Sequence, residues 1–289
     1  MHFHSTRRKV LHAAIASSAG LLAGCSPLRL INGLAPSRTY RATNGLAYGS
    51  HPRYRLDVYR PAQHPGPAPV VVFFYGGNWK SGERGDYLFV GEALASRGFV
   101  AVIPDYRLHP EVRFPAFLED GAKAVSWALS HATEHGGDAG RLFLMGHSAG
   151  AYNAAMLALD PAYLRTAGVE QRRVRGLIGL AGPYDFLPLQ SEVSKAVFGF
   201  PDTPLNTQPI RFVSAVSPPA LLATGDDDSV VRPQNTRRLA SRLRQNGVPV
   251  REISYPDVSH LMLVGALAAP YREFAPVLDD VAGFVKQLG

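Results

Sequence analysis

Apolar and polar positions along the chain predict strands and helices in turn. Continuous apolar runs are typical of strands buried on both faces, whereas apolar residues spaced three and four apart predict amphipathic helices. The runs predict strands at 69–75, 99–103, 142–145, 174–181, 219–224 and 248–255, and the helical spacing predicts helices at 86–97, 115–135, 233–246 and 269–288. Residues 53–59 alternate instead, which predicts a half-exposed antiparallel strand.

This order of elements predicts one α/β domain, built on a mostly parallel sheet with helices on both faces. The roughly 265 residues after position 24 suit a single domain of that kind. In such sheets the loops beyond the carboxyl ends of the strands hold the ligand. We therefore expect the functional residues in those loops.

The first 24 residues differ in composition from the rest. A basic stretch at 7–9 precedes an apolar stretch at 13–23, and small residues close the segment before Cys25. A basic head, an apolar middle and small residues at the end are typical of a secretory signal peptide. The apolar stretch is too short and too rich in Ala, Gly and Ser for a good transmembrane helix. Residues 1–24 are therefore predicted to be a signal peptide.

Two details of this segment resemble bacterial export signals. Arg7 and Arg8 resemble the pair of a twin-arginine signal, and Leu-Ala-Gly-Cys25 resembles the lipobox, whose cysteine is lipidated after cleavage. Ser26 follows instead of Asp, which in Gram-negative sorting favours the outer membrane. The alternative is a chance Arg-Arg pair and an incidental cysteine. We expect a lipoprotein that faces the periplasm and is anchored to the outer membrane through Cys25.

Charge and cysteine content exclude several other classes. The net charge is +7, but without the basic stretch at 7–9 the chain has 27 Lys and Arg against 23 Asp and Glu. The densest basic cluster, 172–175, leads into a predicted strand and is not interleaved with aromatic residues, so nucleic-acid binding is not expected. Cys25 is the only cysteine, and the chain therefore forms no internal disulfide.

The strand at 142–145 leads into the pentapeptide Gly-His-Ser-Ala-Gly at 146–150, and a helix-forming stretch follows. Strand, sharp turn and helix are the context in which Gly-x-Ser-x-Gly presents a nucleophilic serine. The glycines are needed because a Cβ at either position would clash within the strained turn. Ser148 is therefore the predicted nucleophile.

A serine hydroxyl needs a base, and the base needs an acid that orients it. His260 is the only histidine after Ser148 and follows the last predicted strand, so it is the predicted base. The acid is expected after the preceding strand, where three aspartates occur in a row at 226–228. Asp228 is favoured because Val230 and Val231 can pin its loop on the core, and Asp226 is the alternative. Asp257 is a weaker candidate, being too near His260 in the same loop.

Attack by the serine creates an oxyanion that needs N–H donors already in place. One donor is expected from Ala149, the residue after the nucleophile. The others are expected from Gly76 and Gly77, in the loop after the strand that ends at Tyr75. A plain glycine turn would not explain why these glycines occur in the loop where the second donor is required.

Several motifs in order resemble the α/β-hydrolases, in the carboxylesterase and hormone-sensitive-lipase-like branch. They are Asp105-Tyr-Arg-Leu-His-Pro-Glu111, Phe114-Pro-Ala-Phe-Leu-Glu-Asp120 and the pentapeptide at 146–150. Gly76-Gly-Asn-Trp79 and Gly136-Gly-Asp138 resemble the arylformamidase, prenylcysteine-methylesterase and acetyl or feruloyl esterase relatives. The resemblance covers roughly residues 68–265. It implies an α/β-hydrolase fold with an eight-stranded, mostly parallel sheet, helices on both sides and a minimal cap.

Carried over by motif, the resemblance implies a triad of Ser148, Asp228 and His260, with oxyanion donors from Gly76, Gly77 and Ala149. It implies that Asp105, Arg107 and Asp120 brace loops and do not react. The expected division of the chain is a signal at 1–24, a lipidated cysteine with a linker and N-terminal strands at 25–68, and a catalytic core at 69–289.

Two features depart from this family. The family usually has His where Tyr75 stands, and that His orients the oxyanion loop. The helical N-terminal cap of the lipase-like branch is also missing, so any lid must come from 183–218. That segment carries Tyr184, Phe186, Phe198 and Phe200, which are expected either to wall an acyl or aryl pocket or to pack under the loop.

We expect a serine-dependent carboxylic ester hydrolase that acts on small, short-acyl or aryl esters through an acyl-enzyme, with no metal or organic cofactor. An arylformamidase, or a carbohydrate acetyl or feruloyl esterase, is the alternative within hydrolases. A surface lipoprotein that keeps the fold without catalysis is the alternative from another class.

Overall fold

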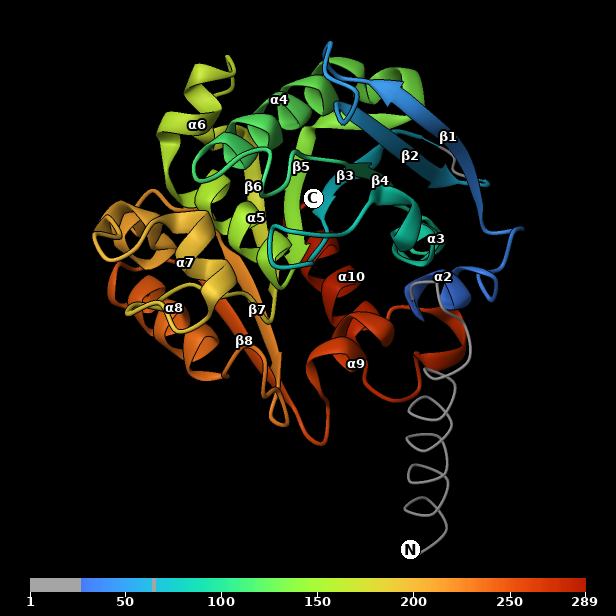
Figure 1. The fold of residues 1–289 in the computed structure, drawn as a ribbon. Helices are drawn as coiled ribbons and strands as arrows, with labels where there is room; N and C mark the ends of the chain where they lie inside the picture. The colour runs from blue at the N-terminus through green and yellow to red at the C-terminus, as the bar shows by residue number, and fades with distance from the viewer. Residues whose placement is uncertain (1–26, 64–65) are drawn as a thin grey trace, which may run out of the picture.

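The computed structural model describes residues 27–63 and 66–289, so the predicted signal peptide and Cys25 lie outside the described residues. The eight strands run in the spatial order β1-β2-β4-β3-β5-β6-β7-β8 (Figure 1). They are β1 Tyr40–Ala47, β2 Arg55–Pro61, β3 Ala68–Phe74, β4 Val100–Pro104, β5 Gly137–His147, β6 Val174–Leu180, β7 Ala220–Gly225 and β8 Val250–Tyr255. The pairs β1–β2 and β2–β4 are antiparallel and the others parallel. The predicted eight-stranded, mostly parallel sheet is confirmed.

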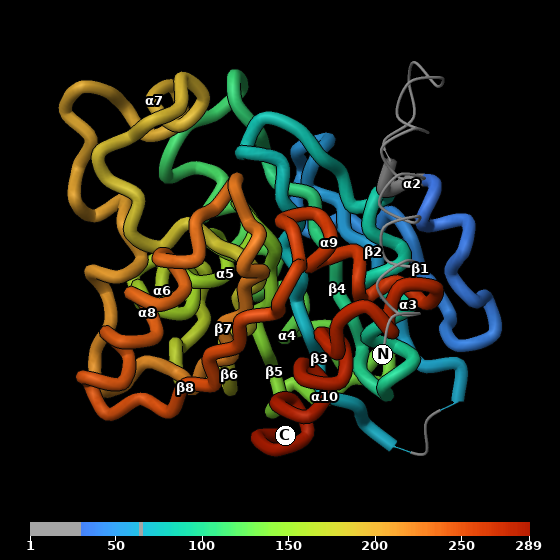
Figure 2. Tube along the Cα trace, turned by 90° about the horizontal axis from the view of Figure 1, so that it is seen from below, coloured from blue at the N-terminus to red at the C-terminus, as the bar shows by residue number. Residues whose placement is uncertain are grey.

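Helices connect the strands and cover both faces of the sheet. They are α2 Pro27–Asn32, α3 Leu88–Ser96, α4 Ala116–His131, α5 Ala149–Leu159, α6 Pro161–Thr166, α7 Glu192–Phe198, α8 Gln234–Gln245, α9 His260–Gly265 and α10 Val277–Leu288. Helices α4, α5 and α6 pack against one another, and the C-terminal α10 lies beside α3, far away in the sequence (Figure 2). Within the described residues, no helix is both long enough and apolar enough to cross a membrane.

Apolar composition explains where each element lies. All seven residues of β3 are buried between β4 and β5, as the continuous apolar run predicts, whereas the edge strand β1 is mostly exposed. Helix α5 is buried along its whole length, and its many alanines let it pack closely on β5 and β6. This packing holds the start of α5 against the carboxyl end of β5.

Three predicted boundaries were wrong. The closing helix was predicted from residue 269 but begins at Val277, because Pro270 and Pro276 interrupt the segment and leave only a 3₁₀ turn, Ala269–Tyr271. The helix predicted at 86–97 begins at Leu88, after the 3₁₀ turn η2, Arg84–Tyr87. The strand predicted at 142–145 is longer and runs from Gly137 to His147, directly after Gly136 turns the chain with a φ of 75°.

The segment 183–218 adds helix α7 and two 3₁₀ turns, Leu205–Thr207 and Pro209–Phe212. Tyr184 and Phe198 are buried, and Phe200 is exposed. Phe198 packs against Phe186 and against aromatic residues of the core. These contacts support the interpretation that the aromatic residues pack under the segment.

Candidate active site

Ser148 lies at a sharp turn between β5 and α5. Its φ of 57° and ψ of −126° are strained for a residue with a side chain. The strand register fixes this turn, because the Ser148 N–H donates to the Leu180 carbonyl on β6 at 2.9 Å. A Cβ added to Gly146 would stand 2.2 Å from the Gly150 carbonyl oxygen, and one added to Gly150 would stand 2.0 Å from that of Phe74. Both glycines of the pentapeptide are therefore required by close packing, as predicted.

Asp228 and His260 meet across two loops at the carboxyl ends of β7 and β8. The His260 Nδ1 donates to Asp228 Oδ2 at 2.7 Å, and both residues are buried. The backbone N–H groups of Val230 and Val231 donate to the other carboxylate oxygen at 2.9 and 2.8 Å. Burial acts to raise the pKa of the Asp228 carboxyl, but these hydrogen bonds and the imidazole outweigh it and lower that pKa. Asp228 is therefore an ionised partner for the imidazole.

The loop that carries Asp228 is held in a different way from that predicted. Val230 was expected to pin the loop on the core, but the residue is 63% exposed. Its contribution is the backbone N–H that holds the carboxylate. Asp226 instead accepts a hydrogen bond from the Asp257 N–H at 2.7 Å, which ties the two loops together. Neither alternative aspartate takes the place of Asp228 beside His260.

Ser148 and His260 line the same cavity, which has a volume of about 380 Å³. Gly76 and Gly77 line it as well, and a Cβ added to Gly76 would stand 2.9 Å from the Ser148 Cβ. Ala149 begins α5, so its N–H belongs to the first turn, whose donors have no acceptor within the helix. Among the hydrogen bonds of the described residues, none joins the Ser148 hydroxyl to His260. Such bonds are often long in free enzymes and tighten with substrate.

The glycine loop after β3 is itself strained and firmly held. Gly77, Asn78 and Trp79 have φ values of 129°, 53° and 55° in succession. The Trp79 indole is buried and donates from Nε1 to the Asn153 Oδ1 on α5 at 3.0 Å. The Trp79 carbonyl accepts from the His109 N–H at 2.7 Å. Sequence reasoning missed Trp79 and Asn153 as supports of this loop, since nothing in the sequence pairs residues so far apart.

Tyr75, the residue directly before the same loop, helps to hold the loop in place. It is fully buried, and its hydroxyl donates to Asp105 Oδ1 at 2.9 Å while accepting from Arg53 Nη2 at 2.8 Å. Arg53 also donates to the Gly82 carbonyl at the far end of the loop. Burial, followed by the charge of Asp105, raises the pKa of Tyr75 well above its usual range, so the phenol stays neutral. Tyr75 thus links the two ends of the loop.

His147, inside the pentapeptide, contacts the backbone of His260. Its Nε2 donates to the His260 carbonyl at 3.0 Å, and the two rings lie 4.6 Å apart. The donor role follows because a carbonyl only accepts. Burial, followed by the nearby His260, lowers the pKa of His147 to about 3, so its ring is neutral. The pentapeptide therefore positions both the serine and the histidine loop.

Asp105, Arg107 and Asp120 do not line this cavity. The Arg107 guanidinium makes two hydrogen bonds to the fully buried Asp120, at 2.7 and 2.8 Å, and the Tyr54 hydroxyl donates to the same carboxylate at 2.7 Å. Asp105 pairs with Arg84 and Tyr75. These charges join loops to the helices and strands beside them, which agrees with the bracing role expected of them.

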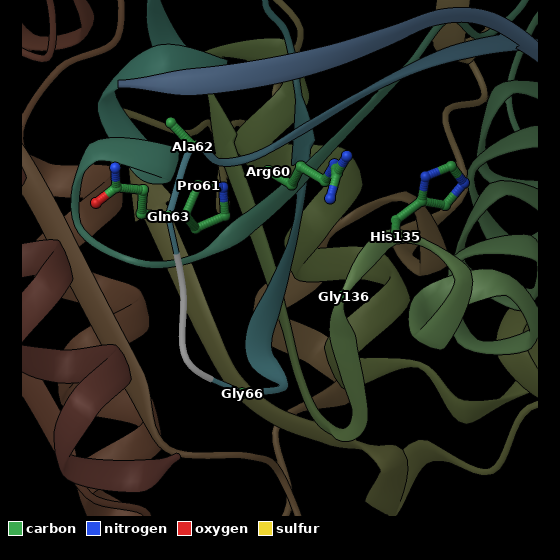
Figure 3. Close-up of a pocket in the computed structure, with 7 residues that line it drawn as sticks. All are labelled: Arg60, Pro61, Ala62, Gln63, Gly66, His135 and Gly136. Carbon is green, nitrogen blue, oxygen red and sulfur yellow. The ribbon is translucent and has the colours of Figure 1, made fainter. Parts of the chain in front are cut away.

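A larger cavity of about 740 Å³ lies at the opposite, amino ends of β3 and β5 (Figure 3). Among the described residues that line it, Arg60 and His135 are titratable, and none is a serine or an acidic residue. No described group of three or more His, Cys, Asp and Glu residues is arranged to hold a metal ion. The larger of these two cavities is therefore not the one that contains the predicted nucleophile, Ser148.

The BD-FAE family model matches residues 56–243, which is well over half of the chain. The chain belongs to the BD-FAE family. This BD-FAE chain is 28% identical over 238 residues to a probable isoprenylcysteine alpha-carbonyl methylesterase of Arabidopsis thaliana, covering 74% of this chain and 50% of the relative. It is 30% identical over 248 residues to esterase LipC of Mycobacterium tuberculosis, covering 79% and 60%. The chain thus spans only half to three-fifths of these two relatives.

Solved structures confirm the α/β-hydrolase fold of this BD-FAE chain. Esterase B from Lactobacillus rhamnosis, inhibited by a tributyrin phosphonate, aligns with a TM-score of 0.78 at 19% identity, covering 100% of this chain and 96% of that one. A truncated carbohydrate esterase from gut microbiota aligns with a TM-score of 0.76 at 20% identity, covering 88% and 98%. The predicted fold is therefore correct, and the family match together with the esterase relatives confirms the predicted superfamily.

Proposed function

We propose that this protein is a serine-dependent carboxylic ester hydrolase that acts on small, short-acyl or aryl esters through an acyl-enzyme. One observation carries the proposal: a strained serine and a carboxylate-oriented histidine line one cavity together with a glycine loop. Relatives named as esterases and methylesterases support an ester as the substrate. Because the chain spans only part of those relatives, their substrates are not transferred to it.

The arrangement suits a two-step acyl transfer. Ser148 Oγ attacks the ester carbonyl carbon while His260 Nε2 takes the hydroxyl proton, and the carbonyl electron pair moves onto oxygen. The N–H groups of Gly76, Gly77 and Ala149 stabilise this oxyanion. The carbon–alkoxy bond then breaks, and His260 returns its proton to the leaving alcohol. Water, deprotonated by His260, releases the acid and restores Ser148.

The electrostatics of the site support these roles. The ionised Asp228 stabilises the imidazolium that forms when His260 accepts the proton, and it fixes the tautomer whose Nε2 is free to act as a base. His147 stays neutral, so it adds no positive charge that would oppose protonation of His260.

The test is Ser148→Ala, with p-nitrophenyl acetate hydrolysis and labelling by a fluorophosphonate as readouts. We expect both to be abolished. Ser217→Ala is a matched control, because Ser217 is 6% exposed like Ser148 but lies outside the cavity. Labelling and turnover should survive in the control. Undiminished turnover of Ser148→Ala would contradict the proposal, and a folded wild-type protein inert in both assays would favour a non-catalytic lipoprotein.

We also propose that the protein is exported and anchored to the outer membrane through a lipidated Cys25. The Leu-Ala-Gly-Cys25 sequence supports this, as do Arg7 and Arg8. A diacylated and further acylated cysteine buries enough CH₂ groups to anchor a protein stably without a spanning helix. Membrane fractionation and mass spectrometry of the Cys25→Ala variant test the anchor. We expect the wild type in the membrane fraction with an acylated N-terminus and the variant released, and a wild type without acylation would contradict the proposal.

A further inference from the structure

Helix α2 and the turn after it carry exposed apolar residues. Ile31 packs against the core, whereas Leu30 and Leu34 are 50% and 54% exposed. The two leucines are four positions apart, and a hydrogen bond of 3.0 Å from the Leu34 N–H to the Ile31 carbonyl closes the turn that joins them. Large apolar side chains that are exposed together are typical of a surface that a partner covers. We call Leu30 and Leu34 the α2 surface.

Helix α2 is fixed to the turn that forms one wall of the Ser148 cavity. Asn32 of α2 donates from Nδ2 to the Gly85 carbonyl at 2.7 Å and accepts at Oδ1 from the Phe89 N–H at 3.1 Å. Gly85 belongs to η2, whose last residue, Tyr87, lines the cavity together with Ser148. The α2 surface is therefore held beside the cavity, and the two cannot move independently.

The mouth of the cavity has exposed apolar residues of its own. Leu261, at the start of α9, and Val230 both line the cavity, and they are 61% and 63% exposed. Figures 1 and 2 agree in placing α9 near α2. The α2 surface and the mouth of the cavity therefore belong to the same side of the molecule.

The sequence before α2 brings the proposed lipid anchor close to this side. Only Ser26 separates Cys25 from Pro27, the first residue of α2. Two residues of chain span at most about 7 Å, and the six residues of α2 rise about 9 Å. A lipid on Cys25 therefore enters the bilayer within roughly 20 Å of η2, whereas a domain of this size is roughly 45 Å across. An anchor at this place holds the side that carries the cavity toward the bilayer.

The charge of the segment after Cys25 suits an anionic lipid surface. Residues 26–56 contain five arginines and no Asp or Glu. Arg38 and Arg41 are exposed, and no ion pair of the described residues includes either of them. Basic residues next to a membrane anchor are attracted to anionic headgroups. A bilayer that contains anionic phospholipid therefore matches both the leucines and the arginines.

On these grounds we propose that the α2 surface rests on a lipid bilayer and holds the mouth of the Ser148 cavity at the membrane interface. The substrate class that follows is an ester with a small acyl group and an alcohol part that carries an alkyl tail. The cavity of about 380 Å³ holds the reacting ester, and the tail stays in the bilayer beside Leu261 and Val230. This inference rests on the proposed ester hydrolysis and lipid anchor, and it deepens both.

The bilayer raises the local concentration of such an ester. An enzyme whose cavity opens at the interface meets the ester there, whereas a cavity that faced away from the membrane would wait for the ester to pass through water. The α2 surface does not touch the reacting atoms. Its effect is therefore expected on esters in the membrane and not on esters in solution.

Fluorescence on vesicle-bound protein tests where α2 lies. Leu34→Cys is labelled with a polarity-sensitive nitrobenzoxadiazole group, and the lipidated Cys25 does not react because its thiol is blocked. On vesicles of phosphatidylethanolamine and phosphatidylglycerol we expect blue-shifted emission and quenching by lipids with nitroxide-labelled acyl chains. Val216→Cys is the matched control, since Val216 is an apolar residue, 78% exposed, just before the amino end of β7 and outside the cavity lining. Its emission should not change.

Turnover of two acetates tests the effect on access. Phenyl acetate dissolves in water, whereas 4-dodecylphenyl acetate has the same acyl group and stays in the bilayer. In the double variant Leu30→Asp with Leu34→Asp, we expect the rate on the membrane ester to fall about tenfold relative to the rate on phenyl acetate, because two carboxylates oppose contact with the interface. Val216→Asp is the matched control and should keep the wild-type ratio. If the double variant does not fold, the Leu34→Cys label decides.

Two results would overturn the inference while phenyl acetate is still hydrolysed. One is a Leu34→Cys label that stays in water on vesicle-bound protein, which would favour a partner protein as the occupant of the α2 surface. The other is a double variant whose ratio equals that of Val216→Asp. A protein that does not bind vesicles at all would overturn the lipid anchor and this inference with it. Absence of phenyl acetate hydrolysis would instead overturn the proposed ester hydrolysis, and with it the substrate class inferred here.

Discussion

Asp120 and Asp228 are both buried carboxylates that accept several hydrogen bonds, but they face different cations. Asp120 faces the Arg107 guanidinium and is also bound by Tyr54. The hydrogen bonds to Asp120 raise the pKa of Arg107 further above its usual range, although burial acts to lower it. Asp228 faces the imidazole of His260, the proposed general base. A guanidinium pair is a fixed brace, whereas an imidazole pair can take part in a reaction.

The surroundings of the two carboxylates differ accordingly. Asp120 lies on α4 and binds the loop after β4, away from the Ser148 cavity. Asp228 lies in the loop after β7 and reaches the cavity through His260. The same residue type thus serves stability at one position and chemistry at the other, and the partner residue determines which. Substitutions at each position should separate these two effects.

The largest effect is expected for Asp228→Asn. An amide cannot balance the imidazolium and disturbs the tautomer of His260, so kcat should fall about 10³- to 10⁴-fold. Ester turnover at pH 8 measures it. Asp226→Asn is the matched control, since Asp226 contacts the Asp257 backbone and not His260, and its turnover should stay within a few-fold of wild type. Equal losses in the two variants would contradict the assignment of the acid.

Asp120→Asn is expected to affect stability instead. The change leaves the Arg107 charge without its buried partner, which typically costs about 3 kcal/mol of unfolding free energy. Urea denaturation measures the loss, and kcat of the folded fraction should change little. Asp279→Asn removes an exposed pair with Arg97 and should cost under about 1 kcal/mol. A large fall in kcat with unchanged stability would show that Asp120 takes part in the reaction.

Tyr75→Phe tests the brace under the glycine loop. It removes hydrogen bonds with Asp105 and Arg53, and we expect a loss of about 1–2 kcal/mol together with a several-fold fall in kcat as the loop loosens. Tyr152→Phe is the control, because its buried hydroxyl binds the Thr207 carbonyl and not this loop. It should lose similar stability with kcat nearly unchanged. A normal kcat in Tyr75→Phe would contradict the positioning role.

Titration of His147 has no effect at neutral pH and is seen only as a pH dependence of stability. Its pKa is lowered to about 3 in the folded protein, so the folded ring stays neutral while the unfolded ring gains a proton below about 6.5. The stability from this neutral ring is therefore complete above pH 6.5 and is lost as the pH falls toward 3. Between pH 6 and 4 the wild type should lose up to about 1.4 kcal/mol per pH unit more than His147→Phe. Parallel stability curves would contradict the buried neutral state.

Much of the fold follows from the sequence because the central strands are continuous apolar runs. All seven residues of β3 are buried, as expected for a central strand of a parallel sheet that helices cover on both faces. The end of the chain was less predictable, since the apolar spacing from 269 onward continues through Pro270 and Pro276. Strand β1 lacks a buried face and therefore gave no apolar pattern.

In the candidate active site, too, some features could be predicted from the sequence and others could not. Ser148 and its two glycines were predictable because the turn leaves no space for a Cβ at 146 and 150. The choice among three adjacent aspartates depended on backbone hydrogen bonds from Val230 and Val231, which no side-chain pattern reveals. The supports of the glycine loop depended on contacts between distant segments, such as Trp79 with Asn153. Short-range constraints were visible in the sequence, and long-range contacts were not.

The most direct test of the central claim is to locate the residue that becomes covalently modified. The wild-type protein is treated with a p-nitrophenyl alkylphosphonate, and the released p-nitrophenol and the adduct mass are measured before peptide sequencing by mass spectrometry. We predict one equivalent of p-nitrophenol per protein and a single adduct on Ser148, slowed by orders of magnitude in Asp228→Asn. An adduct on another residue, or equal rates in Asp228→Asn and wild type, would contradict the account.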